Sequence, residues 1–278
     1  MKLYIISTPI GNLSDMTFRA VETLKEVDFI AAEDTRVSIK LLNYFDIKKP
    51  MISYFEHNKR QKGEEIVAKI LEGKSCGLIT DAGTPAISDP GEDIVSLCHE
   101  RGITVIPVPG ATALISALSV SGQPTGRFTF EGFLSTNKKN RVEHLESLIR
   151  EKRTMIFYEA PHKLKKTLAD MFKYFGDRDI TICREITKKY EEYTKTTLQQ
   201  AIDHYNLNDP RGEFVIVICG NEEEIIEDAQ DIEEKALEKV KEYIDNGDTL
   251  KDAVKYVSET MKVPKNSLYK RALEKFKD

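Results

Sequence analysis

The chain of 278 residues is long enough to bury a sizeable core and to form about two domains with an appendage. Its 40% hydrophobic and 31% charged residues exclude a disordered, collagenous or disulfide-rich chain. The net charge of −5 argues against a wholly basic nucleic-acid-binding surface.

Cysteine usage and hydropathy indicate where the protein works. The four cysteines lie far apart beside apolar residues, and no CxxC pair occurs, so we expect reduced, buried thiols and a cytoplasmic protein. Pro9 and Gly11 interrupt the N-terminal apolar run too early for a signal peptide, and no run approaches the roughly 18 residues of a membrane span. The histidines show no ligand spacing, so we expect no metal site.

The first part of the chain alternates short apolar runs with helical patterns. The runs are LYII, FIAA, MISYF, CGLIT and ITVIPV. Strands separated by helices require crossover connections, so residues 1–122 predict an α/β domain with a mostly parallel sheet. Ligands of such sheets bind beyond the carboxyl ends of the strands.

The rest of the chain is organised differently. Residues 123–220 predict a second α/β domain, and two nearly adjacent strand patterns, DITICRE and YEEYTKT, indicate a hairpin and a mixed sheet. Residues 221–230 read as an acidic linker. Residues 231–278 predict a small helical domain, which is either a helix-turn-helix with an RNA-binding face or a three-helix cap with a charged exterior.

Four loops of the first domain, residues 7–15, 33–36, 80–91 and 107–113, follow predicted strands and therefore meet at one edge of the sheet. Glycines permit close approach of a ligand or of neighbouring backbone in three of these loops, and prolines stiffen the chain there. No GxGxxG or GxxxxGK[ST] motif occurs, so neither a dinucleotide site nor a P-loop is indicated. Tight loops of this kind together predict a ligand pocket.

Several blocks spread over residues 7–192 carry a resemblance to a known family. They are STPIGNLSD, AAEDTRVSIKLL, ITDAGTPAISDPG, PGATALISALSVSG, FEGFL, FYEAPHKL and REITKKYEE. These blocks resemble the tetrapyrrole-methylase-fold methyltransferases and, within them, the branch that methylates small-subunit ribosomal RNA. Ser135 and Lys163 depart from the usual pattern of that branch.

The resemblance implies two α/β domains of the class III methyltransferase type, with a cofactor cleft between them and a small C-terminal helical domain. It also implies S-adenosyl-L-methionine as cofactor, 2′-O-methylation of a cytidine ribose in the decoding region of the RNA, and a homodimer. The substrate would be small-subunit ribosomal RNA or the assembled small subunit. The residues that the resemblance assigns to the cofactor are Pro9, Ile10, Gly11, Asp81, Gly83, Thr84, Pro85, Ile87, Gly110, Ala111, Thr112, Phe133 and Tyr158.

The chemistry of the transfer calls for a base that accepts the hydroxyl proton. We expect Asp34 to be that base and Arg36 to pair with a phosphate or carboxylate, while Glu33 and Glu159 are further acids at the site. The alternative for Glu33, Asp34 and Arg36 is an internal ion pair that fixes the start of a helix.

Basic zones predict the RNA contacts, because phosphates bind lysine and arginine. The expected contacts are Lys138, Lys139, Arg141, Lys163, Lys265, Lys270 and Arg271. Two other functions stay open: methylation of a corrin or porphyrin precursor, which would leave these zones without a use, and a metabolite-sensing regulator that binds nucleic acid through its helical tail.

Overall fold

The structure, a computed structural model, describes residues 1–221, 229–261 and 263–276. The chain divides into two compact units, Met1–Asn221 and Glu222–Asp278. Most of the expected acidic linker, residues 222–228, lies outside the described residues.

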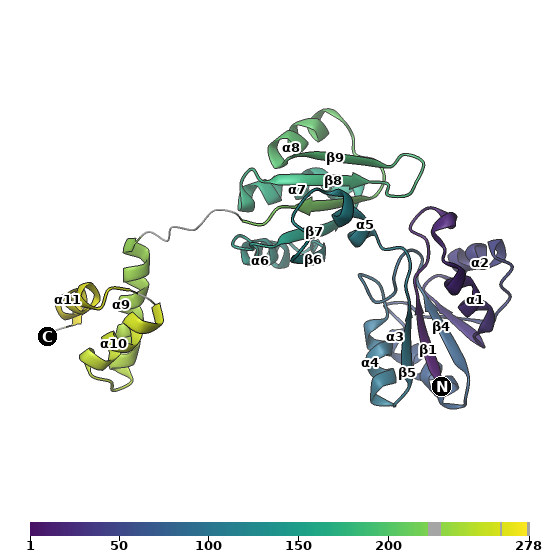
Figure 1. The fold of residues 1–278 in the computed structure, drawn as a ribbon, viewed down its shortest axis with the longest axis horizontal. Helices are drawn as coiled ribbons and strands as arrows, with labels where there is room; N and C mark the ends of the chain where they lie inside the picture. Colours follow the sequence, from purple (N-terminus) through teal and green to yellow (C-terminus); the bar gives the residue numbers. More distant parts are fainter. Residues whose placement is uncertain (222–228, 262, 277–278) are drawn as a thin grey trace. The chain divides into compact units, whose positions relative to one another are not determined.

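A five-stranded parallel sheet forms the centre of the first half of the Met1–Asn221 unit (Figure 1). The strands lie in the order β3-β2-β4-β1-β5. Their bounds are β1 Lys2–Ile6, β2 Phe29–Ala32, β3 Met51–Ser53, β4 Ser75–Ile79 and β5 Thr104–Val108. The predicted parallel sheet is confirmed, and its carboxyl strand ends share one edge.

Helices cover both faces of this sheet (Figure 1). On one face Leu24 packs with Ile30, while on the other Ile66 and Ile70, four residues apart on one helical face, pack with Leu78. The elements between the strands are η1 Leu13–Asp15, α1 Phe18–Glu26, α2 Thr35–Tyr44, α3 Lys59–Leu71 and α4 Glu92–Glu100. The core on both faces holds the strands in place, and the site is left to the loops at their ends.

The second half of this unit contains a mixed five-stranded sheet in the order β6-β7-β10-β8-β9. The β6 and β7 strands pair in parallel, whereas β10 pairs antiparallel with β7 and β8, and β8 pairs antiparallel with β9. The bounds are β6 Phe128–Phe133, β7 Thr154–Glu159, β8 Asp179–Arg184, β9 Glu192–Thr197 and β10 Phe214–Ile218. The predicted mixed sheet and the β8–β9 hairpin are therefore confirmed.

One face of the second sheet packs against three helices, whose apolar side chains form a continuous core with those of the strands. These helices are α6 Lys138–Ser147, α7 Pro161–Phe175 and α8 Leu198–Leu207. Helix α5, Ala113–Val120, covers the other face, where Leu114 and Ala117 pack with Ile156 and Val215. The predicted first domain, residues 1–122, includes α5, whereas the contacts of α5 are with the second sheet.

The Glu222–Asp278 unit is helical, with α9 Ala229–Asp245, α10 Leu250–Met261 and α11 Lys265–Phe276. Leu237, Val254 and Leu268 belong to a core that joins these helices. The predicted helices are confirmed. None of the helices in the described residues is long and apolar enough to cross a membrane.

Candidate active site

The loops that follow β1, β4 and β5 are tied to one another by short hydrogen bonds. The backbone N–H of Thr8 donates to the Gly83 carbonyl at 2.8 Å, and the Gly83 N–H donates back to Thr8 at 3.1 Å. The Ser7 and Thr84 hydroxyls lie 2.8 Å apart, and the Thr84 hydroxyl donates to the Ala111 carbonyl at 3.3 Å. Three of the four predicted loops thus form one fixed surface.

Close backbone packing explains the glycines and the strained residues of these loops. A Cβ atom on Gly110 would lie 2.9 Å from that of Ser7, so only glycine fits there without displacement. Ala86 and Ser88 adopt φ values of 69° and 63°, a left-handed conformation that costs about 1–3 kcal/mol for such residues and is typical of ligand-binding loops.

A cavity of about 430 Å³ lies against these loops and is lined from both halves of the Met1–Asn221 unit. This volume falls in the range of about 300–1,000 Å³ that is usual for small-molecule sites. The lining residues are Ile10, Ala82, Gly83, Thr84, Ile87, Ser88, Asp89, Thr112, Ala113, Phe133, Tyr158, Glu159, Ala160, Pro161, Ile186, Glu213, Phe214 and Val215.

The residues expected to bind the cofactor divide into two groups. The structure brings Ile10, Gly83, Thr84, Ile87, Thr112, Phe133 and Tyr158 together in the lining of the cavity. The others lie in the same loops but not in the lining, namely Pro9, Gly11, Asp81, Pro85, Gly110 and Ala111. Of this second group, Gly110 packs closely against Ser7 behind the lining.

Aromatic rings from the second half form one wall of the cavity. Tyr158 on β7 stacks edge-on with Phe130 and Phe133 on β6, with ring centroids 4.9 and 5.5 Å apart. The Tyr158 hydroxyl accepts a hydrogen bond of 3.0 Å from the Leu114 backbone N–H, and burial raises the pKa of this tyrosine. Tyr158 is therefore fixed, whereas Phe133 remains 53% exposed.

The expected base, Asp34, has another role in the structure. Its carboxylate accepts hydrogen bonds from Arg36 Nε at 3.0 Å and Nη2 at 2.6 Å, and it also caps α2 through the Arg36 backbone N–H. The Arg36 side chain lowers the pKa of Asp34 to about 2. Such a weakly basic carboxylate is a poor proton acceptor, so the structure favours the alternative of an ion pair that fixes the start of a helix.

A different acidic group lies at the cavity. The backbone N–H of Asp34 donates to Asp81 at 3.2 Å, and the N–H of Asp81 donates to Glu33 at 3.4 Å, which links the loops after β2 and β4. Burial raises the pKa of both Glu33 and Asp81. Burial, followed by the nearby charge of Glu33, raises the pKa of Asp89 to about 6. Asp89 lines the cavity, and the sequence analysis missed it although it lies in the ISDPG turn.

Glu159, the other expected acid, lines the cavity but is only 2% exposed. Its carboxylate accepts hydrogen bonds from the Thr167 hydroxyl and from the Ala160 backbone N–H, the latter at 2.8 Å. These contacts connect the end of β7 to helix α7. These contacts hold Glu159 in the wall of the cavity, and its catalytic role stays a prediction.

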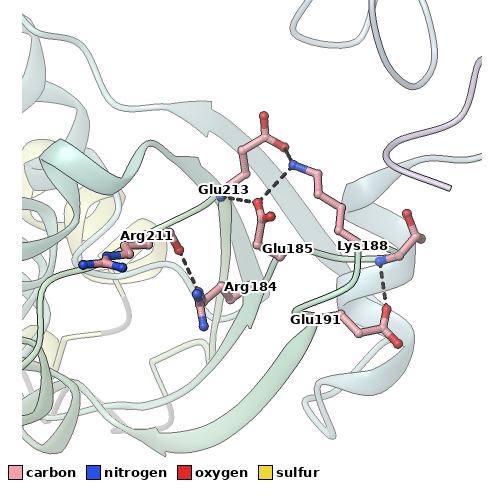
Figure 2. Close-up of polar contacts among 7 residues, drawn as sticks. Arg184, Glu185, Lys188, Glu191, Arg211 and Glu213 are labelled. Carbon is pink, nitrogen blue, oxygen red and sulfur yellow. Dashed lines mark hydrogen bonds and ion pairs between the residues drawn. The ribbon is translucent and has the colours of Figure 1, made fainter.

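The turn between β8 and β9 provides a further wall that the sequence analysis did not identify. Ile186 and Glu213 line the cavity, and Lys188 bridges the carboxylates of Glu185 and Glu213 at 3.0 and 2.8 Å (Figure 2). The REITKKYEE block was the available signal, because it contains both a cation and several acids directly after a strand.

One of the expected RNA contacts is wrong. Arg141 has a side chain that is 6% exposed, and it donates to Asp170 at 2.7 Å and to the Thr167 hydroxyl at 2.9 Å. It holds α6 against α7 and is not available to a phosphate. Lys163 is half-buried, and the remaining expected contacts are exposed at the surface: Lys138, Lys139, Lys265, Lys270 and Arg271.

Among the described residues, no group of three or more His, Cys, Asp or Glu side chains could hold a metal ion. All four cysteines, which lie in the described part, are free thiols. Burial raises the pKa of Cys98 to about 11 and that of Cys183 to about 12.

Comparison with solved structures defines the class of protein. The chain resembles diphthine synthase, with a TM-score of 0.61 and 12% identity over 79% of this chain and 90% of that one. It also resembles uroporphyrin-III C-methyltransferase from Thermus thermophilus complexed with S-adenosylhomocysteine, with a TM-score of 0.56 and 15% identity over 78% of this chain and 97% of that one. The family model described as Tetrapyrrole (Corrin/Porphyrin) Methylases matches residues 2–202. The chain therefore has the tetrapyrrole methylase fold and is a methyltransferase of that family.

Curated relatives make the assignment narrower. A protein from Synechocystis is 48% identical over 98% of this chain and 97% of its own length, and one from Bacillus subtilis is 47% identical over 96% and 92%. A third, from Thermotoga maritima, is 47% identical over 80% of this chain and 99% of its own length. All three are named ribosomal RNA small subunit methyltransferase I. The chain belongs to this family.

Proposed function

We propose that the protein transfers the methyl group of S-adenosylmethionine to the ribose 2′-hydroxyl of a cytidine in the decoding region of small-subunit ribosomal RNA. The observation that carries the proposal is the cavity of about 430 Å³, which fixed loops of the first half and aromatic rings of the second half enclose together. Family membership supports the class of substrate, because the relatives are named for ribosomal RNA of the small subunit.

The residues present fit S-adenosylmethionine. The hydrogen bonds between the loops and the close approach of Gly110 to Ser7 fix the surface against which the cavity lies, and a surface fixed in advance reduces the ordering cost of binding. Phe133 and Tyr158 offer aromatic surface to the adenine. The cofactor would lie against both halves.

The reaction needs alignment and a proton acceptor more than it needs activation of the donor. When bound, S-adenosylmethionine supplies a sulfonium methyl group whose C–S bond breaks as the bond to the ribose oxygen forms. The loops that line the cavity would hold the ribose hydroxyl beside that methyl group. We propose that Asp89 is the base that accepts the proton of the ribose hydroxyl. It lines the cavity, and its pKa of about 6 leaves the carboxylate ionised but still basic near neutral pH.

Binding of the RNA is expected at exposed lysines near the second half of the site. Lys138 and Lys139 begin helix α6, which follows the β6 strand that carries Phe133. Contacts of these lysines with phosphates would be sensitive to salt. The helical Glu222–Asp278 unit presents Lys265 and Lys270 at its surface and is proposed to add affinity for the RNA.

The decisive experiment uses small ribosomal subunits from cells that lack this protein. The purified protein is given radiolabelled S-adenosylmethionine, and the methylated nucleoside is identified by mass spectrometry. A single 2′-O-methylcytidine is expected. Transfer to a corrin or porphyrin precursor instead of RNA would support the small-molecule methylase, and cofactor binding with specific duplex binding but no transfer would support the regulator.

We further propose that the protein works in the cytoplasm as a homodimer. The ribosomal substrate and the free cysteine thiols support the compartment. The homodimer is what the resemblance to the family implies. Light scattering of the purified protein measures the number of copies directly.

A further inference from the structure

The turn that joins β8 to β9 has a strained backbone. Glu185 and Thr187 adopt φ values of 51° and 66°, in the left-handed region that a β-branched residue such as threonine rarely enters. Strain of this kind costs about 1–3 kcal/mol per residue and persists only where surrounding contacts enforce it.

A network of charged side chains holds the turn (Figure 2). Lys188 Nζ lies 3.0 Å from a Glu185 carboxylate oxygen and 2.8 Å from one of Glu213. The Glu191 carboxylate accepts a hydrogen bond of 2.8 Å from the Thr187 backbone N–H. The Glu185 carboxylate also accepts a hydrogen bond of 2.9 Å from the Glu213 backbone N–H. The start of the turn is thereby linked to the residue that precedes β10.

This turn lies at the cavity and touches both halves of the Met1–Asn221 unit. Ile186 of the turn is part of the cavity lining, as is Glu213, which lies directly before β10. The side-chain stem of Lys188 packs on the loop after β1, where a Cβ atom on Gly11 would lie 2.5 Å from Lys188 Cγ. The turn is therefore fixed beside the cavity and against the loop after β1.

The residues that follow Lys188 are exposed at the tip of the turn. Tyr190 is 65% exposed, and Lys189 Nζ lies 5.4 Å from the centroid of its ring. Proteins that bind unpaired RNA stack bases on exposed aromatic rings and contact the adjoining phosphates with cations. A ring carried on a turn that is already rigid can accept a base without the cost of ordering the loop.

We propose that Tyr190 is a stacking platform for an unpaired base beside the target nucleotide, with Lys189 directed to an adjoining phosphate. The inference rests on the proposed function, since a corrin or porphyrin precursor has no such base. It adds a substrate-binding residue outside the cavity and outside the basic zones of the sequence.

The test compares Tyr190→Ala with Tyr190→Phe in methyl transfer to small subunits. Stacking of a base contributes about 1–3 kcal/mol, so the KM of Tyr190→Ala for subunits should rise about 5- to 150-fold. The affinity for S-adenosylmethionine and the kcat at saturating RNA should not change. Tyr190→Phe should behave as the unaltered protein, because stacking needs the ring and not the hydroxyl. Tyr44→Ala is the matched control, because Tyr44 is also 65% exposed but lies at the end of α2.

Each contrary result has a separate meaning. An unchanged KM for Tyr190→Ala, with an active unaltered protein, overturns the platform and leaves the proposed function standing. An unaltered protein that methylates no RNA removes the proposed function and the platform with it. A Tyr190→Ala protein whose molecular mass in solution falls assigns the ring to a contact between copies and likewise overturns the platform.

Discussion

Replacing Asp89 by asparagine should separate the chemistry of the site from its ability to bind the cofactor. The substitution keeps the size of the side chain and removes its basicity. A general base typically contributes about 10²- to 10⁴-fold to a rate, so kcat should fall by at least about 100-fold. The dissociation constant for S-adenosylmethionine, measured by calorimetry, should stay within about twofold because asparagine keeps the shape of the side chain in the loop that lines the cavity.

The pH dependence of the reaction gives a second readout. Asp89 accepts a proton only when ionised, and burial together with the charge of Glu33 raises its pKa to about 6. The rate of the unaltered protein should therefore rise with pH through about 6 and level off above it. Glu33→Gln is the control: Glu33 lies outside the cavity lining, so turnover should persist while the rising limb moves to lower pH.

Asp89→Asn should also change the free energy of unfolding, and the direction of that change follows from the raised pKa of Asp89. Asp89 binds a proton more tightly in the folded protein than in the unfolded chain, whose carboxyl has a pKa near 3.8. The unaltered protein should lose stability as pH rises from about 4 through 6. The shift of about two pH units corresponds to about 3 kcal/mol, which solvent screening of this half-buried group reduces to ~1 kcal/mol.

Chemical denaturation followed by circular dichroism at pH 5 and pH 8 measures that difference. Asp89→Asn should exceed the unaltered protein in free energy of unfolding by more at pH 8 than at pH 5. Full turnover of Asp89→Asn at pH 8 would refute its role as base. A stability difference that does not depend on pH would refute the account of its burial.

Three further predictions concern packing and domain organisation. Gly110→Ala should weaken S-adenosylmethionine binding at least about tenfold by calorimetry, whereas Gly126→Ala, whose added Cβ would meet nothing within 4 Å, should not change it. Arg141→Met should lower the free energy of unfolding by about 2–3 kcal/mol, because it leaves Asp170 without its partner; an unchanged denaturation midpoint would contradict this structural role. Removal of residues 222–278 should preserve the thermal midpoint and cofactor affinity of the first unit but weaken RNA binding. A relative that aligns over 221 residues and 99% of its length agrees with a first unit that folds alone, and loss of cofactor binding on truncation would contradict it.

The alternation of strands and helices was readable from the sequence, but the packing partner of one helix was not. Helix α5 directly follows β5 and its pattern, ALISALSV, is almost wholly apolar. Such a pattern shows that the helix is buried without showing against which sheet. The chain crosses to the second sheet before α5, and only the contacts of Leu114 and Ala117 reveal it.

The charges of the site were harder to interpret than its loops. Counting cations along the sequence gives Arg141 the same weight as Lys139, although one is buried and the other exposed. A usable signal was present, because Arg141 lies four residues before the buried Leu145 and therefore on the same face of α6. For Asp34 the signal was present too, because Arg36, which lowers its pKa, lies only two residues further along the chain. For Asp89 no comparable signal existed, since its basicity depends on burial and on Glu33, which is distant in the chain.

The position of β10 in the second sheet affects how the protein can form during synthesis. This strand, Phe214–Ile218, is the last of its sheet along the chain, yet it lies between β7 and β8 at the centre. The first sheet can assemble on the ribosome as soon as β5 has emerged. The second sheet must wait for more than a hundred further residues, and until then β7 and β8 expose unpaired apolar edges of the kind that promote aggregation. A nascent chain paused before residue 214 is therefore expected to need a chaperone, whereas one paused after the emergence of β10 is not.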